Sequence, residues 1–319
     1  MTPNVSVIVT CFNQEKTLAQ AVISVLNQSF THLECLIIDD GSTDNSRLVA
    51  QALMEEDSRV KYYQKENGGV SSCRNFGITK AQGEWIQFLD GDDWLNLDKI
   101  QTQLDNFSQL KFPLNSPVIL YSDYQKVWVN ESPGQILQIE PQIVGELTTE
   151  NLIKRVLVPD FLAGTPFPLL QQCLLIHRSI FNLKQFDETL KILEDREFVL
   201  HLLTQNIPFI YIPIIGSAYV KYSSPTTLTS NWKTVKLAYL SYYEIIEKKY
   251  PELLPYSQIG IQHFLNEAIR EHQTLAFQRL YPLVRAPITL FEQKLTLPHP
   301  FFLKFVYRFR KIFLKLYRN

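Results

Sequence analysis

Three closely spaced carboxylates follow a short apolar run in the segment "FLDGDDWL", residues 88–95. Asp90, Asp92 and Asp93 repel one another unless a cation or hydrogen-bond donors compensate their charges. Magnesium and manganese ions typically take one or two protein carboxylates, with water and phosphate oxygens completing the coordination shell. The segment therefore indicates a divalent-cation site. The structural alternative is a plain turn in which Asp93 caps the next helix.

No glycine-rich phosphate-binding loop accompanies these carboxylates. The first strand-to-helix turn, "TCFNQEKT" at residues 10–17, lacks the GxGxxG pattern, and GxxxxGK[ST] occurs nowhere in the chain. We therefore expect that any bound phosphate is held through a metal ion and not by a cradle of backbone amides.

Two further acidic motifs could contribute to a site. The segment "DDGSTDNS" spans residues 39–46, and the pair Glu194–Asp195 precedes an apolar run. The structural alternative for the first is a loop with Ser42 or Asp44 at a helix N-cap. For the second it is a pair of first-turn carboxylates that stabilise a helix dipole.

The first hundred residues alternate between strand and helix patterns, which positions these motifs. Short runs rich in β-branched or aromatic residues predict strands at 5–12, 34–40, 60–66 and 84–90, and the segments between them have helical spacing. This order predicts right-handed βαβ units and a largely parallel sheet. Ligands bind beyond the C-terminal ends of such strands, where the acidic motifs occur.

The second half of the chain has a mixed pattern. It predicts strands at 116–129, 172–181 and 207–213, a helix at 194–205, and a Pro- and Gly-punctuated stretch between 130 and 145. From about residue 231 onward it predicts helices. We therefore expect an α/β domain at 1–230 and a helical C-terminal extension at 231–319.

Composition narrows the class of protein. The 319 residues include 31 Lys and Arg against 32 Asp and Glu, so the net charge of −1 gives no signal for nucleic acid, and we predict none as a partner. The four cysteines form no CxxC pair, as expected for reduced thiols. The N-terminus does not resemble a signal peptide and no apolar run spans a membrane, so a cytoplasmic protein is expected.

Four motifs together resemble the inverting family 2 glycosyltransferases. They are "VSVIVTCFNQEKTLAQAVISVLNQSF", "ECLIIDDGSTDNS", "NGGVSSCRNFGITKAQGEWIQFLDGDDW" and "FDETLKILEDREFVLHLL", and the resemblance covers about residues 4–230. It implies the GT-A fold, which is a nucleotide-binding αβα sandwich with a mixed, mostly parallel sheet.

The resemblance also implies roles for single residues. Asp195 corresponds to the general base, and Asp92 with Asp90 corresponds to the pair that binds Mn²⁺ or Mg²⁺, Asp90 also contacting ribose or diphosphate. The implied donor contacts are Thr10, Phe12, Asn13, Asp39, Asp40, Arg74 and Asp90. Within this set, Asp39 corresponds to the carboxylate that accepts a hydrogen bond from the base.

The implied activity is transfer of a sugar from a nucleotide-diphosphate donor, with a UDP-sugar as the first expectation. The acceptor would be a glycan or lipid-linked hydroxyl in cell-envelope polysaccharide or glycoconjugate synthesis. No QxxRW segment occurs, which favours single additions. Tyr222 and Lys221 stand where the family often has a histidine. The alternative is a non-catalytic nucleotide-sugar-binding or scaffold protein at the membrane surface.

The tail, about residues 300–319, combines basic and apolar residues at helical spacing without an acidic residue. The basic positions include Lys304, Arg308 and Lys311, and the apolar ones Phe305 and Phe309. Such a helix suits an anionic membrane surface at the inner face of the membrane. Docking of its apolar stripe on the protein itself or on a partner is the alternative.

Overall fold

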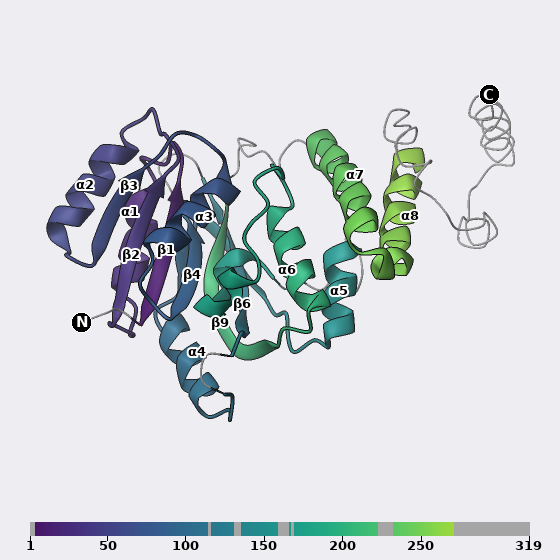
Figure 1. The fold of residues 1–319 in the computed structure, drawn as a ribbon. Helices are drawn as coiled ribbons and strands as arrows, with labels where there is room; N and C mark the ends of the chain where they lie inside the picture. Colours follow the sequence, from purple (N-terminus) through teal and green to yellow (C-terminus); the bar gives the residue numbers. More distant parts are fainter. Residues whose placement is uncertain are drawn as a thin grey trace, which may run out of the picture. The chain divides into compact units, whose positions relative to one another are not determined.

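The computed structural model describes residues 4–113, 116–130, 135–158, 166, 169–222 and 232–270. The chain divides into two compact units, Met1–Gly260 and Ile261–Asn319, and the sheet and site discussed below lie in the first (Figure 1). The tail at 300–319 lies outside the described residues, so its two predicted roles stay open.

Nine strands of the described chain form one mixed sheet. They are β1 (Val5–Cys11), β2 (Leu33–Asp39), β3 (Val60–Gln64), β4 (Trp85–Asp90), β5 (Trp94–Leu95), β6 (Ile119–Val129), β7 (Ile136–Gln142), β8 (Leu174–His177) and β9 (Phe209–Tyr222). The strand order is β3-β2-β1-β4-β8-β6-β9-β5, with β7 paired to β6. Strands β3, β2, β1 and β4 are parallel, whereas β8 is antiparallel to both β4 and β6. The predicted α/β fold with a mixed sheet is confirmed.

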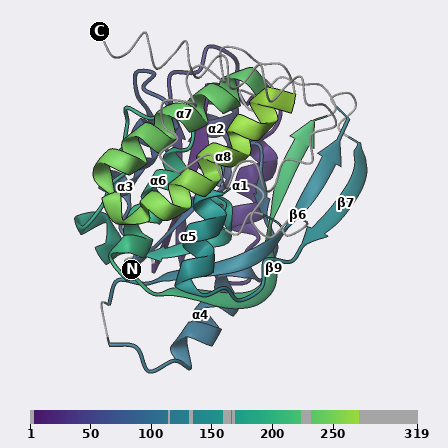
Figure 2. The same cartoon turned by 90° about the vertical axis from the view of Figure 1, so that its right-hand side faces the viewer.

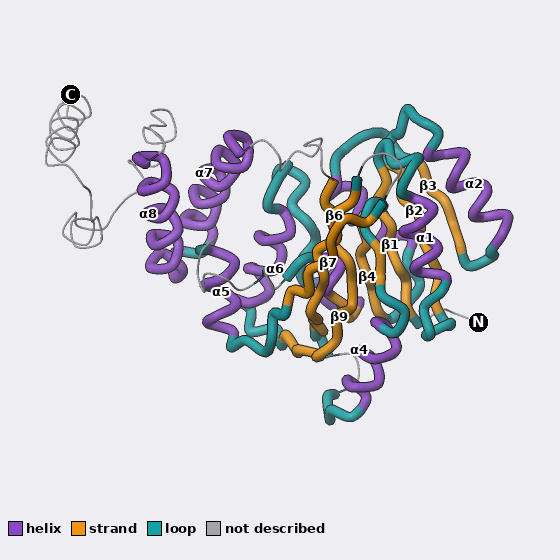
Figure 3. The backbone as a smooth tube through the Cα atoms, turned by 180° about the vertical axis from the view of Figure 1, so that it is seen from behind, coloured by secondary structure: helices purple, strands orange, loops and turns teal. Residues whose placement is uncertain are grey.

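Helices lie on both faces of this sheet (Figure 3). They are α1 (Leu18–Leu26), α2 (Ser46–Glu56), α3 (Val70–Lys80), α4 (Lys99–Ser108), α5 (Thr149–Leu157), α6 (Glu194–Thr204), α7 (Trp232–Lys249) and α8 (Leu254–Arg270). The predicted helix at 194–205 and the predicted C-terminal helices are therefore present.

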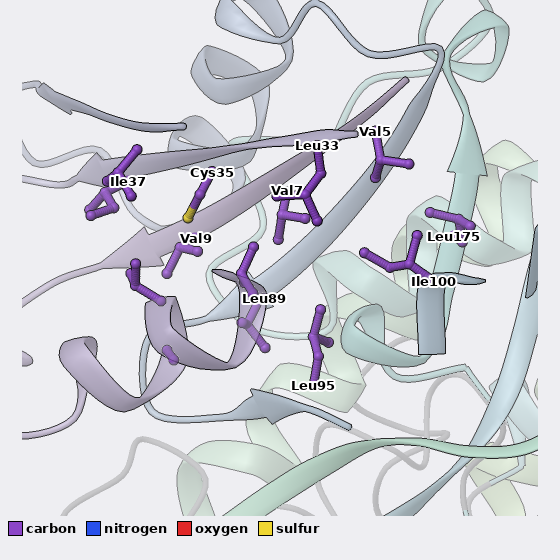
Figure 4. Close-up of a cluster of buried hydrophobic side chains, with 14 of the residues drawn as sticks. Val5, Val7, Val9, Leu33, Cys35, Ile37, Leu89, Leu95, Ile100 and Leu175 are labelled. Carbon is purple, nitrogen blue, oxygen red and sulfur yellow. The ribbon is translucent and has the colours of Figure 1, made fainter. Parts of the chain in front are cut away.

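Alternate residues of the central strands pack against different helices. Val7 and Val9 of β1 lie in a buried apolar cluster with Leu89 of β4 (Figure 4), and the fully buried Val22 of α1 belongs to the same cluster. Ile8 points to the other face, where a Cβ added at Gly77 of α3 would lie 2.5 Å from Ile8 Cγ2. Because both faces are covered, the strands read as nearly continuous apolar runs in the sequence.

The second half of the sheet differs in detail from the sequence-based prediction. Strand β9 continues beyond the predicted 207–213 segment and runs parallel to β6 along its whole length. Strand β7 and helix α5 occupy stretches where no element was predicted. In Figure 2, β6, β7 and β9 lie side by side and extend past the central strands.

Two expectations from composition can be compared with the structure. The four cysteines are buried and unpaired, and burial raises the pKa of Cys35 and of Cys173 to about 12, as suits inert reduced thiols. Across the described ranges, none of the helices is both long enough and apolar enough to cross a membrane.

Candidate active site

The register of the parallel strands brings polar residues together at one edge of the sheet. Thr10 of β1 lies opposite Asp90 of β4, and Cys11 lies opposite Asp39 of β2. The Thr10 hydroxyl donates a hydrogen bond to Asp90 Oδ1 over 2.8 Å. The predicted convergence of strand ends is therefore observed for Thr10 and Asp90.

Arg74 of α3 connects Asp90 to the first turn of α6. Its Nη2 donates to Asp90 Oδ1 at 3.3 Å, and its Nη1 donates to Glu194 Oε1 at 2.9 Å. The Arg74 side chain is only 4% exposed, and its guanidinium lies 5.3 Å from the centre of the Phe186 ring. Glu194, the partner of Arg74, was not among the predicted site residues, because no local sequence pattern in either segment indicates this contact.

Asp92 and Asp93 have different surroundings although they are neighbours. Asp93 is buried and accepts hydrogen bonds from Val220 N and Gln172 Nε2, both at 2.8 Å. Asp93 therefore connects the turn after β4 to β9 and to Gln172, and it does not cap a helix, since the N-cap of α4 is Asp98. Asp92 is partly buried. Among the other described residues, none donates a hydrogen bond to its carboxylate. Burial and the charge of Asp90 raise the pKa of Asp92 to about 6.

The residues present fit a divalent cation of the magnesium type. The described residues hold no preformed group of three His, Cys, Asp or Glu side chains for a metal. Magnesium and manganese sites on nucleotides do not need one, because substrate phosphates and water supply most ligands. The Asp92 carboxylate, with its unfavourable charge beside Asp90, is the donor that such an ion would stabilise.

Asp195 lies in the first turn of α6, next to Glu194. It is partly buried, and its Oδ1 accepts a hydrogen bond from Arg196 N at 2.8 Å. Glu194, its neighbour in the chain, accepts a hydrogen bond from Arg74, which also donates to Asp90. The structure thus brings Asp195 to the same edge as Asp90.

Tyr219 of β9 connects these acidic groups electrostatically. Burial raises its pKa, and the charges of Asp93, Asp90, Asp92 and Asp195 raise it further. The four carboxylates therefore lie within electrostatic range of one side chain. Tyr219 was missed in the sequence; its alternation with Lys221 on a polar face of a strand was the available signal.

Lys221 supplies a positive charge beside this group. Its Nζ donates to the Tyr219 hydroxyl at 2.6 Å and lies 4.1 Å from the centre of that ring. Burial lowers the pKa of Lys221, an effect that the charges of Asp93 and Asp92 oppose. Burial, then Asp92 and Asp93, raise the pKa of Tyr222 to about 12. The following residues, 223–231, are outside the described chain.

Phe12 and Asn13 form a neighbouring surface beyond the end of β1. Phe12 is 49% exposed. Asn13 has a left-handed backbone with φ of 53°, and its side-chain oxygen accepts a hydrogen bond from Thr43 N at 2.8 Å. An exposed aromatic ring next to a rigid turn is a suitable surface for a planar ligand group.

Asp39 is fully buried at the end of β2. Its Oδ1 accepts a hydrogen bond from Ser42 N at 2.8 Å, and its Oδ2 accepts one from the Tyr62 hydroxyl at 2.6 Å. An ionised carboxylate can accept about four hydrogen bonds, so each Asp39 oxygen retains a lone pair for a further donor.

Asp40 is also buried and binds the loop before α3. It accepts hydrogen bonds from Lys65 Nζ at 2.7 Å, from Gly68 N at 3.0 Å and from Gly69 N at 2.7 Å. Its contacts order that loop, and its predicted role toward a ligand stays a prediction.

Comparison with known proteins identifies the sequence family. The model of glycosyl transferase family 2 matches residues 6–179, which is more than half of the 319-residue chain. An uncharacterized glycosyltransferase of Haemophilus influenzae is 42% identical over 104 residues, covering 32% of this chain and 42% of the relative. Glycosyltransferase GlyG of Streptococcus pneumoniae is 39% identical over 103 residues, covering 32% and 34%. The chain thus spans less than half the length of these curated relatives.

Solved structures share the fold. Residues 1–349 of TarS from S. aureus in complex with UDP superpose with a TM-score of 0.59 at 19% identity, covering 88% of this chain and 81% of that one. The mannosyltransferase PcManGT from Pyrobaculum calidifontis, in complex with GDP-Man and Mn²⁺, superposes with a TM-score of 0.56 at 13% identity, covering 97% and 81%.

Proposed function

The chain belongs to glycosyl transferase family 2, and from this membership we propose that it is a metal-dependent, inverting glycosyltransferase acting on a nucleotide-diphosphate sugar. The observation that carries the proposal is that Arg74 donates hydrogen bonds to both Asp90 and Glu194, which brings the strand end that bears Asp90 to the turn that bears Asp195. The site would thus combine two carboxylates that can bind a cation, Asp90 and Asp92, with one that can accept a proton, Asp195.

The proposed reaction is a single displacement at the anomeric carbon of the donor sugar. The oxygen of an acceptor hydroxyl forms a bond to that carbon while the bond from carbon to the diphosphate oxygen breaks, and the diphosphate leaves with the electron pair. Asp195 takes the hydroxyl proton as general base. In-line attack through a transition state with oxocarbenium character inverts the anomeric configuration, so an α-linked donor gives a β-linked product.

Asp92 and Asp90 would hold the divalent cation, Mn²⁺ or Mg²⁺. When bound, the ion neutralises negative charge on the departing diphosphate. Lys221 adds a fixed positive charge near Asp92 and takes the place of the histidine that the family often has. The complex of PcManGT with GDP-Man and Mn²⁺ supports this choice of cofactor.

Thr10, Phe12 and Asn13 at the end of β1, with Asp39 and Asp40 at the end of β2, are the proposed contacts to the nucleoside. A UDP-sugar is the first donor to test, since TarS has been solved with UDP and with UDP-GlcNAc. GDP-Man bound to PcManGT makes a GDP-sugar the second.

The proposed acceptor is a hydroxyl of a glycan or a lipid-linked saccharide in cell-envelope polysaccharide or glycoconjugate synthesis. Reaction on the cytoplasmic side and addition of one sugar at a time complete the proposal. Names of the curated relatives support the sugar-transfer class and do not specify an acceptor.

A thermal-shift panel tests the donor site directly. UDP, GDP, CDP and dTDP are added with and without Mn²⁺ to the wild type and to Asp92→Ala. A nucleotide at a hundredfold excess over its Kd stabilises the fold by about 2.7 kcal/mol. We expect one nucleotide to raise Tm only with Mn²⁺ and only when Asp92 is intact. If no nucleotide shifts the wild type, the enzyme assignment fails and the scaffold alternative replaces it.

A further inference from the structure

Arg74 joins the proposed metal-binding carboxylate to the turn that carries the proposed base. We propose that the Arg74–Glu194 ion pair is a positioning device that holds Asp195 in register with the donor site. This inference rests on the proposed function. Its basis is one buried guanidinium that donates to Asp90 and to Glu194, whose segments are far apart in the sequence.

A second contact from α3 binds the segment that leads into α6. Asn75, the neighbour of Arg74, donates from Nδ2 to Phe186 O at 2.9 Å and accepts from Phe186 N at 3.0 Å. The Phe186 ring stacks on Phe198 of α6 with a centre-to-centre distance of 4.3 Å and also lies against Arg74. Two consecutive residues of α3 therefore fix the segment that leads into α6.

The turn held in this way has an unusual backbone. Leu193, directly before Glu194, adopts the left-handed conformation with φ of 67° and ψ of 18°. A leucine rarely adopts this conformation, and such residues persist where surrounding contacts over-determine the geometry, often at active sites. The next residue, Glu194, binds Arg74, and the residue after it, Asp195, is the proposed base.

The geometry also couples the two halves of the site. Asp90 Oδ1 accepts hydrogen bonds from both Thr10 and Arg74, which leaves Oδ2 for a cation or a donor group. Because the Arg74 guanidinium contacts both carboxylates, a change in the position or charge of Asp90 should alter the position of Glu194. The planar fork of arginine can bind two carboxylates in fixed directions, and the point charge of lysine cannot reproduce this arrangement.

Glu197 provides a matched comparison within the same helix turn. It is fully buried, as Glu194 nearly is, and Lys184 Nζ lies 2.9 Å from its Oε2. Lys249 and Tyr250 also contact it. None of these partners touches Asp90 in the described structure. A loss of the Glu197 charge therefore removes a buried ion pair of α6 without breaking the link to the donor site.

The test compares Glu194→Gln with Glu197→Gln, using the nucleotide that the thermal-shift panel identifies. The rate of nucleotide-sugar hydrolysis, with water as acceptor, is measured as release of the nucleoside diphosphate. We expect Glu194→Gln to lower kcat ten- to a hundredfold with the donor KM within twofold of the wild type. Glu197→Gln should lower Tm and keep kcat within twofold. Arg74→Lys should lower kcat to a similar extent, and kcat of the double variant Arg74→Lys, Glu194→Gln should be no lower than that of either single variant.

Hydrogen exchange gives a readout other than activity. In the wild type, the nucleotide with Mn²⁺ should increase protection of the 193–197 amides at least threefold, and in Glu194→Gln this increase should be lost. Unchanged kcat in Glu194→Gln, equal kcat losses in the Glu194 and Glu197 variants, or additive losses in the double variant would each overturn the inference. If Glu197→Gln does not fold, additivity and hydrogen exchange decide. Wild type that binds no nucleotide would instead refute the proposed function itself.

Discussion

Glu194 and Asp195 are adjacent carboxylates with different surroundings, and this difference is the basis of their different proposed roles. Glu194 is buried and already binds Arg74, and burial together with Asp195 raises its pKa. Asp195 is less buried and binds only the amide of Arg196 through one of its oxygens among the described contacts. A proton acceptor must be free to contact the incoming hydroxyl, so we assign this role to Asp195.

Asp195→Asn tests that assignment. The amide retains the size of the side chain and cannot take the acceptor proton, so kcat should fall by about 10²–10⁴. Nucleotide binding with Mn²⁺, measured by calorimetry, should stay within a few-fold of the wild type, because Asp195 is not a proposed donor contact. Near-normal turnover of this variant would transfer the base to another group, with Glu194 the first to examine.

Single residues differ in how well the sequence reveals them. Asp90, Asp92 and Asp195 could be singled out as candidates, since acidic residues follow apolar strands or open a helix in characteristic motifs. The role of Asp93 as a buried acceptor for Val220 N could not, because it depends on a strand distant in the sequence. Local patterns identify residue types and cannot identify partners across the fold.

At the scale of elements, the contact between α3 and the sheet depends on a missing side chain. A Cβ at Gly77 would lie 2.5 Å from Ile8 Cγ2 and 3.2 Å from Ile38 Cγ1, and both isoleucines are fully buried. Gly77→Ala should therefore destabilise the fold by about 1–3 kcal/mol, despite the better helix propensity of alanine. Urea unfolding measures this. Thr79→Ala, at an exposed position of the same helix, should be neutral, and equal effects would contradict the close-packing argument.

Lys99, at the start of α4, gives the stability of the fold a pH dependence. It is fully buried, it donates to Gln87 Oε1 and Gln103 Oε1, and burial lowers its pKa to about 7. Between pH 7 and the unfolded pKa of about 10.4, the unfolded chain binds a proton that the folded chain does not. Lysine 99 therefore makes the free energy of unfolding rise with pH, by at most about 1.4 kcal/mol per unit.

The measurement is urea unfolding of the wild type and Lys99→Met between pH 6.5 and 8.0. Both proteins have the same cysteines, so the titration of unfolded thiols cancels in the difference between them. The difference between the two proteins should change in favour of the wild type as pH rises. A difference that is independent of pH would mean that Lys99 stays protonated in the folded protein.

Elements were predictable where their burial produces a pattern. Strands β1, β2 and β4 lie between helices and read as apolar runs, so they could be placed from the sequence. In β7, Ile136, Leu137 and Ile139 are about half exposed on an edge strand, so no alternation of apolar and polar residues marks it. Helix α5 did have a sequence signal, since threonine is a common N-cap residue and Thr148 precedes the helix. In the structure, the Thr148 hydroxyl accepts a hydrogen bond from Asn151 N as the N-cap.

At the scale of the whole molecule, charge is distributed unevenly along the chain. Residues 300–319 contain six of the 31 basic residues and no acidic one, so residues 1–299 hold 25 basic against 32 acidic residues, a net charge of −7. An anionic membrane would repel the bulk of such a protein and attract its tail. A lipid-linked acceptor would make this attraction useful, because it would bring the proposed site to the surface where the acceptor resides.

The combined variant Lys304→Gln, Arg308→Gln, Lys311→Gln tests the tail in the full chain. Each basic residue near an anionic surface contributes about 1 kcal/mol, so partitioning onto phosphatidylserine-containing vesicles should weaken by roughly a hundredfold. Co-sedimentation measures it, and binding to neutral vesicles should not change. The control variant replaces three lysines that are exposed in the structure with glutamine, at Lys16, Lys111 and Lys248. It should have little effect on vesicle binding. Unchanged vesicle binding with a lowered Tm would show that the tail packs on the protein itself.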